Sequence, residues 1–114
     1  MRLALCLWLL MAGTAWAGDD PEIEFLLTAV EQSDCTFIRN DKSHSAEAAA
    51  DHLRMKYKRG RWAVGNAEEF ISRIASKSTM SGNPYRVQCA QDEPELTGDW
   101  LTDRLAEYLS LIHI

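Results

Sequence analysis

The first seventeen residues have the pattern of a cleavable export signal, and this limits the fold to the residues that follow. Arg2 supplies a positive start, residues 3–12 are almost entirely apolar, and residues 15–17 have the small-x-small form of a cleavage site. The apolar run is about ten residues long, whereas a membrane-spanning helix needs roughly 20. We therefore expect cleavage between Ala17 and Gly18 and a protein that is periplasmic or secreted.

Export also determines how the cysteines are interpreted. Cys6 lies in the leader, so Cys35 and Cys89 remain, and an even number of cysteines in an oxidising compartment favours a disulfide. The alternative is a pair of buried or redox-active thiols, but the close C-x-x-C spacing typical of redox pairs does not occur in this sequence. The loop-entropy model assigns about 4 kcal/mol to a bridge that closes a loop of this length. We predict a structural disulfide between Cys35 and Cys89.

The chain after the leader is long enough for one small domain, which we place at residues 18–110. The formal net charge is −5 at pH 7, and loss of Arg2 with the leader makes the domain more acidic still. Nucleic-acid binding requires clustered positive charge, so we expect no nucleic-acid partner. Because no later apolar run approaches spanning length, we expect a soluble monomer without a transmembrane segment.

Four helices are predicted from apolar residues at helical spacing and from capping signals at the helix starts. Gly60 has the position of a C-terminal glycine after the second helix. The expected N-caps are Asp20, Ser45, Asn66 and Asp99. The corresponding helices cover about residues 21–32, 46–59, 67–76 and 100–110.

Two short segments, residues 36–39 and 85–89, have the β-branched and alternating patterns of strands. If the two cysteines face each other in an antiparallel pair, Phe37 faces Val87, because side chains on one face repeat every second residue. Residues 40–43 form a turn or loop. The expected fold is a small α+β domain in which three or four helices pack on a short two-stranded antiparallel ribbon, held by one disulfide.

The sequence contains two sets of residues that resemble a metal site or a catalytic site, but neither set has the spacing of a known motif. His44, Glu47 and Asp51 are spaced to line one side of a helix start, as zinc or copper ligands would. Their spacing differs from H-E-x-x-H, and acidic residues at a helix start are also favoured by the helix dipole. Nearby serines offer a nominal Ser-His-Asp set, but neither G-x-S-x-G nor S-x-x-K occurs. We assign no metal site, no catalytic residue and no cofactor.

The best polar binding patch is a basic run at residues 54–61 within an otherwise acidic protein. Such a patch can dock an anionic envelope component or an acidic partner protein. The alternative is the last turn of a helix, where the dipole favours cations. The loop at residues 76–85 is the second part of the candidate surface. The candidate binding residues are Arg39, His44, His52, Lys56, Tyr57, Arg59 and Trp62.

A series of ordered motifs also carries a family resemblance. The motifs are residues 37–40, 52–53, 56–57, 70–71, 75–78, 81–82, 84–85 and 100–101, with His44 between the first two. In this order they resemble the YfeK-like family of small exported bacterial proteins, a family whose domain has no known function. The resemblance covers about residues 21–109 and implies a signal peptide and a small soluble domain, without an established activity, cofactor or catalytic residue.

Two positions depart from expectation. Asp41 stands where the resemblance leads us to expect glycine, which favours a longer loop over a tight Asn-Gly hairpin. Residues 111–114 end a polar stretch with large apolar side chains, and this tail resembles translated sequencing-adapter read-through, the alternative being a final helical turn. We therefore treat residues 111–114 as a tail that is not counted in the domain.

These observations favour a non-enzymatic binding or interaction module of the cell envelope, because a polar and aromatic patch occurs without a catalytic motif. Two alternatives stay open. One is a small envelope hydrolase that uses His44 or His52 as general base with Asp51 as orienting group. The other is an inhibitor of an envelope-degrading enzyme, a role that needs no catalytic residue.

Overall fold

The computed structural model describes residues 20–112, so the expected leader, the cleavage site at Ala17 and Gly18, and the last two residues of the tail lie outside the described part. The described chain has four main helices and four strands. The helices are α2 (Pro21–Glu31), α3 (Ala46–Gly60), α4 (Ala67–Phe70), which continues as the π-helical turn η3 (Ile71–Ala75), and α5 (Thr97–Ile112). None of the helices described is both long and apolar enough to cross a membrane.

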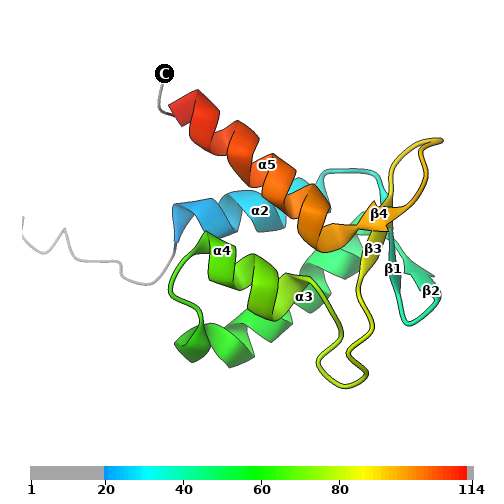
Figure 1. Cartoon of the computed structure of the whole chain (residues 1–114), viewed down its shortest axis with the longest axis horizontal. Coiled ribbons are helices and arrows are strands. Elements are labelled where there is room, and N and C mark those ends of the chain that lie inside the picture. The colour runs from blue at the N-terminus through cyan, green and yellow to red at the C-terminus, as the bar shows by residue number, and fades with distance from the viewer. Residues whose placement is uncertain (1–19, 113–114) are drawn as a thin grey trace, which may run out of the picture.

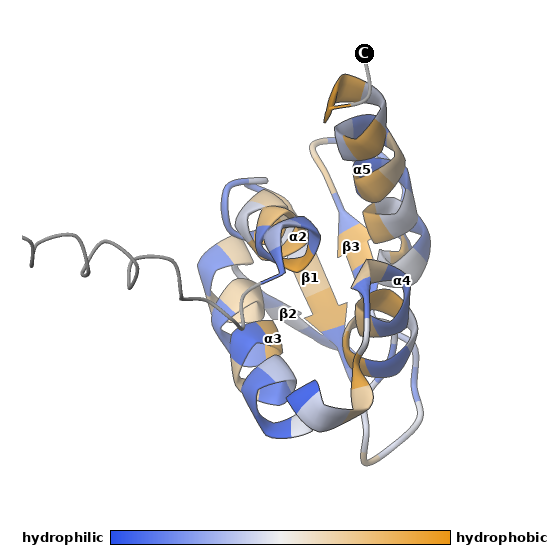
Figure 2. Cartoon of the chain, turned by 90° about the vertical axis from the view of Figure 1, so that its left-hand side faces the viewer, coloured by the Kyte–Doolittle hydropathy of each residue, from blue (hydrophilic) through white to orange (hydrophobic). Residues whose placement is uncertain are grey.

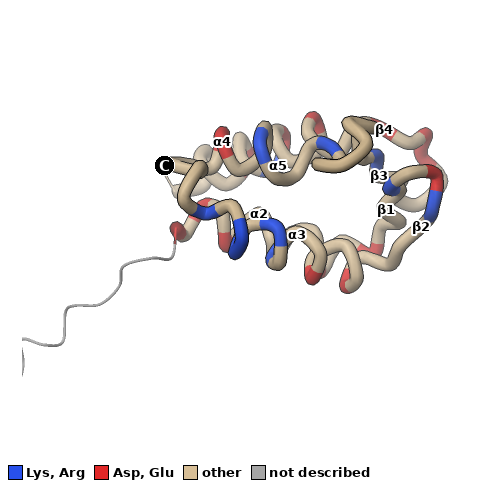
Figure 3. The backbone as a smooth tube through the Cα atoms, turned by 90° about the horizontal axis from the view of Figure 1, so that it is seen from below, with Lys and Arg blue, Asp and Glu red and all other residues tan. Residues whose placement is uncertain are grey.

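The helices form two layers, and the strands close one end of them. Helices α2 and α3 form one layer and α4 and α5 the other, with β1 and β3 between the layers at the far end (Figures 1 and 3). The apolar sides of the helices face inward (Figure 2). Helix α5 extends through Leu111 and Ile112, so the first half of the expected tail continues a helix.

The four strands form one antiparallel sheet in the order β2-β1-β3-β4. Their bounds are β1 (Thr36–Arg39), β2 (Lys42–His44), β3 (Arg86–Gln88) and β4 (Glu95–Leu96). The expected two-stranded ribbon is the central pair β1–β3, and its register is confirmed because Phe37 faces Val87. The edge strands β2 and β4 extend this ribbon to a four-stranded sheet. The α+β class is confirmed.

The connection between β1 and β2 is a tight turn, and the expectation of a longer loop at Asp41 is wrong. Arg39 pairs with Lys42, which leaves Asn40 and Asp41 as a two-residue loop. Their φ angles are 52° and 66°, the left-handed pair that a type I′ hairpin turn requires. Asn and Asp tolerate this region better than other non-glycine residues, so glycine is not needed here.

Three of the four expected helix caps are confirmed. The side chain of Asp20 accepts a hydrogen bond from the Glu22 amide at 2.8 Å, and Ser45 Oγ accepts one from the Ala48 amide at 3.1 Å. Asn66 Oδ1 likewise accepts from the Glu69 amide at 2.9 Å. These caps satisfy amides that have no partner within the first turn.

Two expected helix boundaries are wrong. Helix α5 begins at Thr97, so Asp99 lies within its first turn and does not cap it. Gly60 is the last residue of α3 and has φ −107°, so it is not the left-handed glycine expected after the helix. The following residues continue instead as a short 3₁₀ turn, η2 (Arg61–Ala63).

The core lies between the two helical layers and the inner face of the sheet. Phe70 is fully buried and meets Tyr57 edge-to-face, with ring centroids 5.5 Å apart. The predicted disulfide between Cys35 and Cys89 is confirmed, and it joins the start of β1 to the end of β3 across a separation of 54 residues. The bridge thus fixes the two strands whose other ends carry the site described next.

Candidate functional site

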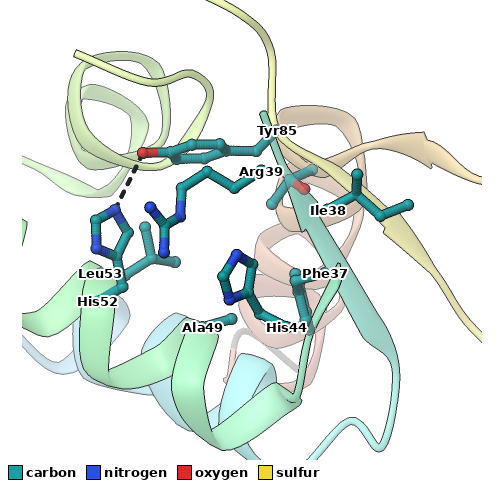
Figure 4. A pocket seen from close by; sticks show the side chains of 9 residues that line it. Phe37, Ile38, Arg39, His44, Ala49, His52, Leu53 and Tyr85 are labelled. Atoms are coloured by element: carbon teal, nitrogen blue, oxygen red, sulfur yellow. Dashed lines mark hydrogen bonds between the residues drawn. The ribbon is translucent and has the colours of Figure 1, made fainter. Parts of the chain in front are cut away.

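Three basic side chains from two elements converge on one tyrosine, and we call Arg39, His52 and Lys56 the cationic cluster. Lys56 Nζ donates to the Tyr85 hydroxyl at 3.0 Å, and His52 Nε2 lies 3.3 Å from the same oxygen. Since an ammonium can only donate, the hydroxyl is free to donate its own proton to His52 Nε2. Figure 4 shows Arg39, His52 and Tyr85 around a common space.

The local fold explains why these side chains meet. His52 and Lys56 are four residues apart on α3, so they lie on one face of the helix. Arg39 is the last residue of β1, where the tight turn holds it beside that face. Tyr85 is fixed through its backbone, because its amide donates to the Ser76 carbonyl and its carbonyl accepts from the Thr97 amide, both at 2.9 Å.

The loop before β3 is pinned against the β1–β2 turn. Ser81 Oγ donates to Asn40 Oδ1 at 2.8 Å, and Asn83 Nδ2 donates to the same oxygen at 3.2 Å. Lys56 Nζ also donates to the Lys77 carbonyl at 3.0 Å, which ties the loop to α3. The candidate loop of residues 76–85 is therefore one wall of the site.

The cationic cluster has no carboxylate partner within residues 20–112. The ion pairs in that part of the chain occupy Glu31, Glu69 and Glu107, and all three lie outside the cluster. Burial, then the charges of Arg39, Lys56 and His44, lower the pKa of His52 below its usual 6.5. Burial and Arg39 also lower the pKa of Lys56. Arg39 and Lys56 therefore supply the positive charge of the site near neutral pH, and a bound anion would favour protonation of His52 as well.

The phenol of Tyr85 responds to the same surroundings. Burial raises the pKa of Tyr85 above its usual 10.0, and the charge of Arg39 offsets part of this rise. The neutral phenol is consequently the form present near neutral pH, able to accept from Lys56 and donate to His52. Lys56 Nζ lies 4.9 Å from the centroid of the tyrosine ring, close enough for a cation–π contact.

The cationic cluster forms one side of an open groove of about 650 Å³, which we call the groove. Its lining comes from α3, η2, η3, the end of β1 with the turn that follows it, and the loop of residues 76–85. Trp62 and Met80 are strongly exposed at its rim, at 88% and 96%. The groove is lined by Arg39, Asn40, His52, Met55, Lys56, Arg59, Gly60, Trp62, Ala63, Arg73, Ile74, Ser78, Thr79, Met80 and Tyr85. No aspartate or glutamate occurs in this lining.

A smaller cavity of about 30 Å³, the inner pocket, lies between α3 and β1. It shares Arg39, His52 and Tyr85 with the groove, so these three side chains stand between the two spaces. The remaining lining is mostly apolar. It consists of Phe37, Ile38, His44, Ala49, Leu53 and Thr97.

Six of the seven candidate binding residues lie around these two spaces. His44 lines the inner pocket, and Arg59 and Trp62 line the groove beside the cationic cluster. Tyr57 does not join them, because it is 6% exposed and packs in the core on Phe70. Sequence reasoning placed Tyr85 at the end of the candidate loop and at the start of the second predicted strand, opposite Arg39, but did not include it among the binding residues. Its position opposite Arg39 was the signal that could have identified it.

The structure also bears on the metal and catalytic alternatives. Among the described residues, no group of three or more His, Cys, Asp or Glu side chains is placed to hold a metal ion. His52 is within hydrogen-bond distance of the Tyr85 hydroxyl, and no hydrogen bond in residues 20–112 joins His52 to Asp51, the orienting group of the hydrolase alternative. What the arrangement offers chemically is a set of donors and positive charges suited to an oxyanion.

Comparisons with known proteins agree with the motif pattern. A family model described as a family of unknown function, DUF5329, matches residues 17–109. The uncharacterized protein YfeK of Salmonella typhimurium is 39% identical over 82 residues, which is 68% of each chain. No solved structure gave a significant match.

Proposed function

The chain belongs to the family of unknown function DUF5329, and we propose that it is a non-enzymatic binding module of the cell envelope whose ligand site is the groove. One observation carries this proposal. The cationic cluster is partly buried, is not matched by any carboxylate in the groove lining, and belongs to a protein of net charge −5. Such a local excess of positive charge attracts anions against the overall charge of the protein.

The rim of the groove adds an apolar component to this charge. Trp62, Met80 and the partly exposed Met55 border the same space as the cationic cluster. Aromatic and methionine side chains are enriched in binding surfaces, where methionine adapts its shape to the ligand. The ligand that suits the groove therefore combines an anionic group with an apolar portion.

We place this module in the periplasm as part of the same proposal. The leader pattern of residues 1–17 and its small-x-small ending support export. The disulfide between Cys35 and Cys89 supports an oxidising compartment, where such bridges persist. An envelope location brings the groove close to anionic envelope components.

Site-directed photocrosslinking in the native cell tests the proposal. We expect a photoreactive residue at Met80 to give a discrete adduct, and one at the exposed Ala106 on α5 to give none. Arg59→Glu reverses a charge in the groove lining and should reduce the Met80 adduct several-fold. Lys58→Glu is the matched control, because it makes the same change on α3 outside that lining and should leave the adduct unchanged.

The contrast between the two charge reversals decides the outcome. If Arg59→Glu and Lys58→Glu reduce the adduct equally, binding follows the overall charge of the protein and the groove is not its site. An equally strong adduct at Ala106 would also contradict the proposal, because that position lies on α5 and does not line the groove.

A further inference from the structure

The two most exposed large apolar side chains of residues 20–112 are Trp62 and Met80, and both border the groove. We call them the apolar tips. Trp62 lies in η2, directly after α3, and Met80 lies in the loop of residues 76–85, so two separate segments bring them to one site. The end of α3 and this loop both lie along the lower edge of the molecule in Figure 1. Apolar side chains gathered at one exposed site indicate contact with a partner or a membrane.

Positive charge accompanies the apolar tips. Arg59 and Arg73 are exposed and line the same groove, and the cationic cluster lies half-buried within it. The groove lining contains no carboxylate, although the protein as a whole has a net charge of −5. This end of the molecule therefore complements an anionic surface, whereas the overall charge of the protein is repelled by one.

The order of apolar and charged groups distinguishes a membrane from a protein partner. A protein interface has an apolar centre inside a polar rim. The groove has the reverse order, because its half-buried residues include Lys56 and His52 while the apolar tips are almost fully exposed. A bilayer presents its phosphates at the surface and its hydrocarbon beyond them, so it suits cations that are set back from exposed apolar side chains. Tryptophan is also the side chain that membrane interfaces favour.

We propose that the open side of the groove docks on the surface of an anionic phospholipid bilayer, with the apolar tips inserted among the headgroups and the groove cations against the lipid phosphates. This inference rests on the proposed function and names the occupant of the groove. Each basic side chain near an anionic membrane contributes about fivefold in affinity. Burial of about 60 Å² of apolar surface, which is roughly a third of a tryptophan side chain, contributes about tenfold.

Vesicle binding by the mature protein, which begins at Gly18 after the expected cleavage, tests this inference. The vesicles contain phosphatidylcholine alone, or phosphatidylcholine of which about a third is replaced by phosphatidylglycerol. We expect the protein to sediment with the anionic vesicles only, and added salt to release it by screening the charges. Trp62→Ala should weaken binding about tenfold. Leu111→Ala is the matched control, because it truncates an exposed apolar side chain on α5 and should leave binding unchanged.

Two further measurements test the charge and the depth of docking. Arg59→Gln should weaken binding about fivefold, whereas Arg86→Gln should not, because Arg86 is exposed on β3 and does not line the groove. Bromine atoms on the acyl chains quench a tryptophan that enters the membrane. They should quench the fluorescence of the wild type but not that of Trp62→Phe, whose remaining tryptophan, Trp100, is 6% exposed.

Three results would overturn the inference. They are equal binding to the two kinds of vesicle, equal losses in Trp62→Ala and Leu111→Ala, and a wild type whose fluorescence brominated lipid does not quench. A Met80 photoadduct that is a protein, or binding of inorganic phosphate without binding of vesicles, would reject the membrane but leave the groove as the proposed site. Failure of the proposed function itself is detected separately, by equal effects of Arg59→Glu and Lys58→Glu on the photoadduct.

Discussion

Replacing both Cys35 and Cys89 by alanine lowers the free energy of unfolding by about 4 kcal/mol. The reason is the length of the loop, since the bridge joins positions 54 residues apart and restricts the unfolded chain accordingly. Because small domains are stable by only about 5–15 kcal/mol, this loss removes a large part of the total. Urea unfolding of the oxidised wild type and the double variant measures the difference.

The reduced wild type is the matched control for this experiment. It keeps both side chains at Cys35 and Cys89 but lacks the bond, so its stability should lie close to that of the double variant. A loss below about 1 kcal/mol would show that the bridge constrains the unfolded state little. In that case other contacts would have to hold β1 against β3.

Phe70→Ala is expected to destabilise the domain by about 3–5 kcal/mol. The side chain is fully buried between the helical layers and meets Tyr57 edge-to-face at 5.5 Å. Its truncation removes a large apolar group and leaves a cavity that the neighbouring helices cannot fill completely. Thermal and urea unfolding of the variant give the magnitude.

Trp62→Ala is the contrasting substitution. Trp62 is 88% exposed, so its loss should change the free energy of unfolding by less than about 0.5 kcal/mol. The same substitution should weaken ligand binding, because Trp62 borders the groove. Comparable destabilisation by Phe70→Ala and Trp62→Ala would contradict the division between the core and the binding surface.

The central part of the fold is predictable from local sequence signals. The apolar stripes identify the helices because each helix buries one face, and Ile23, Leu26 and Val30 are all buried as their spacing requires. The β1–β3 register follows from the two cysteines, since a disulfide brings its strand positions together and side chains alternate on either side of it. These signals act within a few residues or through a covalent bond.

The edges of the sheet lack such signals. Strand β2 consists of three polar residues, Lys42, Ser43 and His44, and β4 has only two residues. Both form because the central pair offers free backbone groups to which a neighbouring segment can bond. The tight turn at Asn40 and Asp41 likewise depends on the pairing of β2 with β1. This turn was not predicted, because the sequence has Asn-Asp here and not the Asn-Gly pair that usually marks such a turn.

The candidate site was predictable only in part. His52 and Lys56 share a helix face and were both identified, but Tyr57 turns about 100° away from Lys56 and enters the core. Tyr57 lies in the apolar stripe of α3, and this position was the sequence signal that its side chain belongs to the core. The inner pocket was not foreseen, because Thr97 and Phe37 come together only when α5 packs beside the sheet.

The pKa of His52 provides the most direct test of the claim that the cationic cluster binds an oxyanion. In the free protein, burial and the neighbouring cations hold this pKa below 6.5. A bound oxyanion favours the imidazolium, so the pKa of His52 should rise on binding, and by linkage the affinity should increase as the pH falls toward the pKa of His52 in the free protein.

Nuclear magnetic resonance titration of the His52 ring, with and without saturating inorganic phosphate, measures this shift. We predict a pKa below 6.5 without the ligand and a clearly higher pKa with it. His52 and Lys56 are both hydrogen-bonded to the Tyr85 hydroxyl, so the imidazole ring of His52 lies close enough to the other cations of the cluster to respond to an anion bound there. An unchanged pKa of His52 in the presence of bound ligand would show that the anion lies elsewhere, and it would contradict the central claim.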